Sequence, residues 1–122
     1  AVQLLLERYN LTDPAAGNAA GVFTNAELQA LYAKLVEQGS TSLTEALSVG
    51  AEIEELDIVD LRSRASDKAD VDLVYSNLER GSRNHLRAFT KQLDRNGSTY
   101  EPMHLPTADY DAIVSGDIER GQ

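Results

Sequence analysis

Two long helical segments follow one another almost directly in this sequence. The first opens at Ser42, where a capping signal precedes an apolar period, and runs without a proline to about residue 66. The second covers about 70–95 and ends at Asn96-Gly97. Because the polar break at 67–70 is so short, the two helices must lie antiparallel. The pattern therefore predicts an all-α fold built on a helical hairpin.

The composition agrees with a single packed helical domain. The chain has 122 residues, 42% of them apolar but only 6% aromatic, so the core must come mainly from Leu, Val, Ile and Ala. A formal net charge of -9 repels phosphate backbones and anionic lipids, which excludes nucleic acid and membrane surfaces as expected partners. Without cysteine, any metal must be held by Asp, Glu or His.

The flanking segments divide as 1–10, 11–41 and 98–122. The first is helical in pattern and starts without an initiating Met, so we expect that N-terminal sequence is missing. The second is a crossover with a short helix capped at Thr24, and the third is a tail with a helix capped at Thr107. No apolar run approaches the roughly 20 residues that span a bilayer. The cytoplasm is the default location, with secretion or lipid anchoring if a signal was removed.

Glu54 lies in the middle of an apolar stripe of the first long helix. The residues that share its side at 100° per residue are Leu43, Leu47, Gly50, Ala51, Ile58, Leu61 and Ala65. A carboxylate in such a setting must be hydrogen-bonded, paired, protonated or coordinated to a cation. Arg83, Arg87 or a tyrosine hydroxyl would serve as an ordinary partner.

His85 takes the equivalent inward position on the second long helix. A hairpin turn at about 67–69 places Gly50 opposite His85 and Gly81-Ser82 opposite Glu54, which predicts a polar pocket with space beside each polar residue. In this register Glu54 and His85 are offset by on the order of 6 to 8 Å along the axis. An inward histidine is as often a hydrogen-bonded core residue as a ligand.

The other acidic residues are weaker candidates as ligands. Asp57 and Glu55 flank the stripe and are secondary choices for a metal. We expect Glu52, Glu55 and Asp60 to be solvated or in surface ion pairs, because the helical wheel turns them outward or toward the flanks.

Further polar residues on the second helix and in the tail do not complete a motif. Ser82 stands where a Glu-x-x-His ligand pair would need glutamate, and Glu79 is turned away from His85. Ser82 as a nucleophile with His85 as its base is a poor interpretation, because the pair lacks an oxyanion hole and an orienting acid. His104 is predicted to be a packing or surface residue.

A second apolar stripe on the first long helix faces away from Glu54. It consists of Ala46, Val49, Ile53 and Leu56. The crossover helix, the tail or a second subunit must cover it.

The segments Gly50 to Leu61 and Asn77 to Phe89 resemble the ferritin-like family catalogued as domain of unknown function 2202. The resemblance extends back to Phe23 and forward to Ile113. It implies a ferritin-like four-helix bundle, in which 1–10 ends the second helix, 42–66 is the third and 70–95 is the fourth. In di-iron bundles of this kind each hairpin supplies one Glu and one Glu-x-x-His.

The resemblance matches Glu54 to the lone Glu of the hairpin and His85 to the His of its Glu-x-x-His motif. Ser82 stands where that motif has its Glu. A standard di-iron site is therefore in doubt, which leaves a mononuclear site, an altered site or no metal site as the alternatives. The leading hypothesis is a protein that binds, oxidises or sequesters iron or another divalent metal, with no organic cofactor. Its partner would be a second copy or the missing half of the bundle. The alternative is a non-catalytic scaffold with a buried polar network, and the sequence leaves open whether the protein is an enzyme.

Overall fold

A computed structural model describes residues 1–121, and Gln122, the end of the predicted tail, lies outside the described residues. The helices of this range are α1 (Val2–Arg8), α2 (Ala26–Gly39), α3 (Leu43–Ser63), α4 (Ala69–Arg95) and α5 (Thr107–Val114). Residues 1–121 contain no strand, which confirms the all-α class. No helix in this range is both long and apolar enough to cross a membrane.

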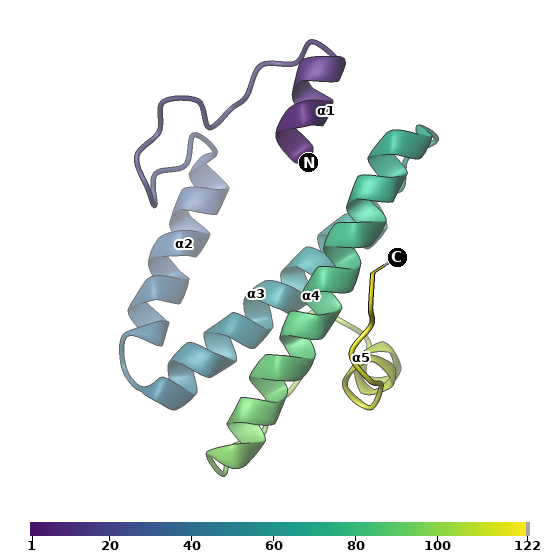
Figure 1. Cartoon of the computed structure of the whole chain (residues 1–122). Helices are drawn as coiled ribbons and strands as arrows, with labels where there is room; N and C mark the ends of the chain where they lie inside the picture. The colour runs from purple at the N-terminus through teal and green to yellow at the C-terminus, as the bar shows by residue number, and fades with distance from the viewer. Residues whose placement is uncertain (122) are drawn as a thin grey trace.

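The long helices α3 and α4 form the predicted antiparallel hairpin (Figure 1). The first begins where Ser42 accepts a hydrogen bond from the Glu45 N–H, as its capping signal predicts. It ends at Ser63, about one turn earlier than the sequence pattern indicates, and the chain then takes five residues to reach α4. This earlier end changes the register of the hairpin.

Replacing Ser42 with alanine is expected to destabilise the protein by about 1 kcal/mol, because the first turn of α3 loses a side-chain acceptor. Urea denaturation followed by circular dichroism measures the change. Ser76→Ala is the matched control, since Ser76 is exposed inside α4. An equal loss in both variants would contradict a capping role.

Two other predicted caps are wrong. Asn25, not Thr24, caps α2 by accepting from the Leu28 N–H, and Thr24 instead donates to the Pro14 carbonyl in the preceding loop. Thr107 is the first residue of α5 and makes no capping hydrogen bond. Asparagine and threonine are both good N-cap residues, so adjacent candidates are not separated by residue type.

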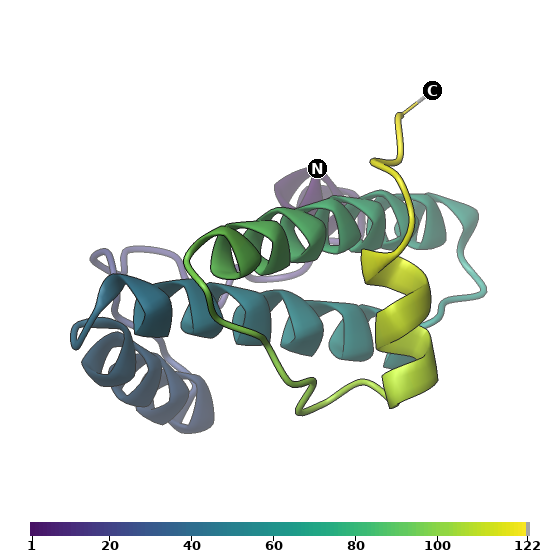
Figure 2. The same cartoon turned by 90° about the horizontal axis from the view of Figure 1, so that it is seen from below.

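The core lies between the hairpin and the tail rather than inside the hairpin alone. Its buried apolar residues are Ala51, Ile58, Leu86, Leu93, Tyr100, Leu105, Tyr110 and Ile113, half of them from the tail. Figure 2 shows the segment between α4 and α5 passing across α3 before α5 packs beside the hairpin. The tail is therefore an integral layer of the fold.

The helix α2 packs against α3, and Leu35 and Val49 are buried where they meet. The crossover helix thus covers part of the second apolar stripe, as predicted, although Ile53 stays exposed. The helix α1 stands apart in Figure 1 and buries no side chain. Arg8 and Tyr9 tie it to α4 through hydrogen bonds to Asp70.

Candidate functional site

Glu54 of α3 and His85 of α4 are in direct contact. Glu54 Oε1 lies 3.1 Å from His85 Nδ1. The predicted axial offset is therefore wrong. Gly50 faces the Phe89 ring and not His85, which shifts the register by four residues, about one helical turn.

The two side chains differ in their exposure. The Glu54 side chain is 13% exposed and the His85 side chain is 66% exposed. Within residues 1–121, the prediction that His85 faces a shielded interior is wrong, because its side chain is mostly exposed. The Phe89 ring, and not an open pocket, fills the space beside Gly50. The pair forms a site on one open face of the hairpin.

The surroundings of Glu54 make its negative charge costly. Burial raises the pKa of Glu54, while the buried Ser82 hydroxyl and the His85 imidazole partly offset that rise. With Glu54 ionised, Nδ1 of His85 donates the hydrogen, and Nε2 makes no hydrogen bond within residues 1–121. A cation beside Glu54 would stabilise the carboxylate.

Asp57 lies in the same neighbourhood. Burial and the charge of Asp60 raise the pKa of Asp57, and the charge of His85 lowers it. Asp60 itself is exposed and forms a surface ion pair with Arg64 at 2.8 Å, as predicted. Asp57 is thus the carboxylate of α3 that could add to the Glu54–His85 pair.

The donors of this pair suit a divalent metal by type and spacing, but not by number. Carboxylate oxygen and imidazole nitrogen are ligands of iron, manganese and zinc. Two such ligands, each about 2.1 Å from an ion and near a right angle, lie about 3 Å apart. Among residues 1–121, no group of three Asp, Glu or His side chains is arranged to hold an ion.

Glu55 is not a solvated residue, contrary to the prediction, and it is not available as a ligand. Its side chain is completely buried and accepts hydrogen bonds from the Tyr100 hydroxyl and from the N–H groups of Met103, His104 and Leu105. Burial raises the pKa of Glu55, but these hydrogen bonds outweigh it and the pKa is lowered overall. Both oxygens are committed to holding the tail on α3.

Glu52 is also buried, contrary to the prediction, and forms a second carboxylate–imidazole pair. Its Oε1 lies 3.2 Å from Nε2 of His104, in the segment that crosses α3. The helical wheel correctly predicts that Glu52 points away from the Glu54 side of α3, but the tail covers the side of α3 on which Glu52 lies. The proline-flanked Met103-His104-Leu105 segment was the one available signal that the tail docks there.

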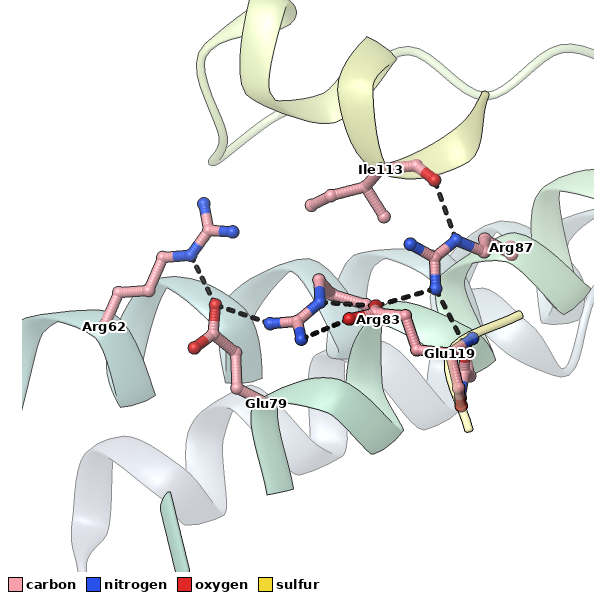
Figure 3. A network of polar contacts seen from close by, with 7 residues as sticks. Arg62, Glu79, Arg83, Arg87, Ile113 and Glu119 are labelled. Atoms are coloured by element: carbon pink, nitrogen blue, oxygen red, sulfur yellow. Dashed lines mark hydrogen bonds and ion pairs between the residues drawn. The ribbon is translucent and has the colours of Figure 1, made fainter. Parts of the chain in front are cut away.

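The alternative partners of Glu54 are occupied elsewhere. Arg83 and Arg87 bind Glu119 of the tail, and Glu79 bridges Arg62 and Arg83 (Figure 3). Glu79 therefore points into this ion-pair network, away from His85 as the sequence indicates. Within residues 1–121, Glu54 instead interacts with two residues of α4, the His85 imidazole at 3.1 Å and the Ser82 hydroxyl, which stabilises its charged form.

The fold and the site define an all-α protein in which an antiparallel helical hairpin carries a carboxylate–imidazole contact between its two long helices. The chain belongs to the family described as uncharacterized protein domain DUF2202, whose model matches residues 1–117. Membership of the family catalogued as domain of unknown function 2202, which the sequence resemblance predicted, is therefore confirmed.

A relative of known sequence and a solved structure share this fold. Uncharacterized protein MJ0754 of Methanocaldococcus jannaschii is 47% identical over 99% of this chain, and the chain spans 66% of that protein. The crystal structure of hypothetical protein MJ0754 from Methanococcus jannaschii superposes with a TM-score of 0.93 at 46% identity, covering 97% of this chain and 69% of that one.

Proposed function

We propose that the protein is a ferritin-like metal-binding protein in which Glu54 and His85 supply half of a site for iron or another divalent metal. The observation that carries this proposal is the 3.1 Å contact between Glu54 Oε1 and His85 Nδ1, which joins residues 31 positions apart at the spacing of two ligands on one ion. A bound ion would supply Lewis acidity or, for iron, one-electron redox chemistry.

The charge of the site supports the proposal. The pKa of Glu54 is raised by burial, and that of Asp57 is raised by burial and by Asp60, so both carboxylates lack a full counter-charge. A divalent cation would provide one. Asp57 and residues outside the pair would then complete the coordination.

The remaining donors must come from another helical segment. The His85 side is open, and Leu78, two turns away on the same face of α4, is 42% exposed. The other half of a four-helix bundle, or a second copy of the chain, would bring that helix and its carboxylates.

A structural role is the second candidate. The Glu54–His85 contact is already a hydrogen bond between α3 and α4, and with the buried Ser82 hydroxyl it could fix the hairpin register without any ion. The protein would then be a helical scaffold or interaction domain.

The two functions are separated by metal analysis of the protein purified from its source and by titration with Fe²⁺, Mn²⁺ and Co²⁺. We expect Glu54→Gln and His85→Ala each to weaken metal binding by at least about 10- to 100-fold, because each removes a ligand from an incomplete set. Cobalt absorption and calorimetry measure the change.

The Glu52–His104 pair provides a matched control, since it joins the same two groups at 3.2 Å on the other side of α3. Glu52→Gln and His104→Ala should leave metal binding unchanged. Metal-free protein with no affinity for these ions, or an equal loss in both sets of variants, would reject the metal function and leave the structural one.

A further inference from the structure

Four cationic residues follow one line along α4. Arg83, Arg87, Lys91 and Arg95 recur at every fourth position, so successive side chains are neighbours on one face. Like charges at this spacing destabilise a helix unless anions lie beside them. In a chain of net charge -9, this row of cations calls for a specific partner.

The first half of the row already holds an anion. Arg83 donates two hydrogen bonds of 2.7 Å to the Glu119 carboxylate, and Arg87 donates a third at 2.9 Å (Figure 3). The guanidinium groups hold the pKa of Glu119 at about 2. This half of the row thus binds a carboxylate from the tail.

The second half has no such partner within residues 1–121. Lys91 and Arg95 form no ion pair there, and neither does Arg120 of the tail, which faces the same space. The three line a groove of about 1170 Å³ between α4 and the tail. Asp94 and Asp117 also line it, so the cations outnumber the carboxylates.

Arg87 connects the two halves of the row. Its Nε donates to the Ile113 carbonyl and its Nη1 to Asn84 and Glu119, which fixes the guanidinium at the wall of the groove. Its Nη2 has no hydrogen bond within the described residues. Arg87 thus keeps unused donor capacity while it lines the groove.

We propose that this groove binds a small oxyanion, a phosphate or carboxylate group, through Arg87, Lys91, Arg95 and Arg120. Cations in the last turns of a helix also offset the partial charge of about -0.5 at its C-terminus. Two full charges on Lys91 and Arg95 exceed that need, and Arg120 adds a third from the tail. The site is separate from the Glu54–His85 pair and requires no metal.

The test is titration of the isotope-labelled chain with inorganic phosphate, pyrophosphate and succinate at low ionic strength, followed by amide chemical shifts. Saturable shifts are expected for residues 87–95 and 116–120, and the tighter probe identifies phosphate or carboxylate as the preferred group. Lys91→Gln/Arg95→Gln should weaken binding by about tenfold or more, because two charge-assisted contacts are lost.

The control double variant is Lys34→Gln/Arg64→Gln, which changes the net charge equally on exposed parts of α2 and of the segment after α3. It should bind as the unmodified chain does, and so should Glu54→Gln. The proposal is overturned by an absence of saturable shifts with all three anions. Equal weakening in the two double variants also overturns it, since this would mark a bulk charge effect.

Discussion

Replacing Glu55 with leucine is expected to destabilise the protein by about 3–5 kcal/mol, although leucine is the more apolar residue for a core position. Glu55 is fully buried and accepts one hydroxyl and three backbone N–H groups. Leucine would leave these donors without an acceptor, and each unsatisfied buried donor costs about 1–3 kcal/mol. Urea denaturation at neutral pH measures the loss.

Glu55→Gln separates charge from hydrogen bonding at the same position. Glutamine keeps one acceptor oxygen but turns an NH₂ group toward a backbone donor, so we expect an intermediate loss of about 2–3 kcal/mol. Glu54→Gln on the open face should cost less than either Glu55 variant. A Glu55→Leu protein as stable as the unmodified one would show that the tail does not depend on this carboxylate.

The same contact makes the stability depend on acid. The pKa of Glu55 is lowered in the folded protein, so the unfolded chain takes up the proton first as the pH falls. The contribution of Glu55 is complete above its unfolded pKa, near 4.5, and is lost as the pH falls through the folded value. Glu55→Leu should therefore show a smaller loss of stability below pH 4.5 than the unmodified chain.

The helical hairpin was predictable because its signals are local. The Ser42 cap, the uninterrupted apolar period and the Asn96-Gly97 stop each lie within a few residues of the feature they determine. The hairpin register was not, because it depends on where α3 ends. The helix α3 ends at Ser63 instead of 66. The residue of α4 that faces Glu54 is then one turn farther along α4 than predicted, and it is His85.

The carboxylates of the tail interface were missed for a physical reason. A helical wheel gives the direction of Glu52 and Glu55 on α3 but not what lies there. The donors to Glu55 come from residues 45 to 50 positions away in an irregular segment. Such a segment has no apolar periodicity from which its packing against α3 could be predicted. Buried charges whose partners lie on loops are therefore the least predictable part of this fold.

Replacing Arg87 with methionine is expected to release the tail from α4 at a cost of about 2–4 kcal/mol. Methionine keeps the apolar stem, but it removes the hydrogen bonds to the Ile113 carbonyl, to Asn84 and to Glu119. The Arg87 side chain is only 12% exposed, so water replaces these bonds poorly. Hydrogen exchange should rise in α5 and in residues 115–119 and stay slow in α3.

Arg95→Met is the matched control, because Arg95 lies on the same face of α4 without an ion pair in residues 1–121, and it should change stability by less than about 0.5 kcal/mol.

Acid reproduces part of the effect of Arg87→Met. The pKa of Glu119 is lowered to about 2, so its contribution is complete above the ordinary value near 4.5 and is lost as the pH falls toward 2. Because Arg87→Met leaves Arg83 to bind Glu119, that variant should keep a weaker form of the Glu119 contribution, whereas Glu119→Gln should remove that contribution and leave the one from Glu55. Fast exchange throughout α3 in Arg87→Met would instead mean that the tail and the hairpin unfold as one unit.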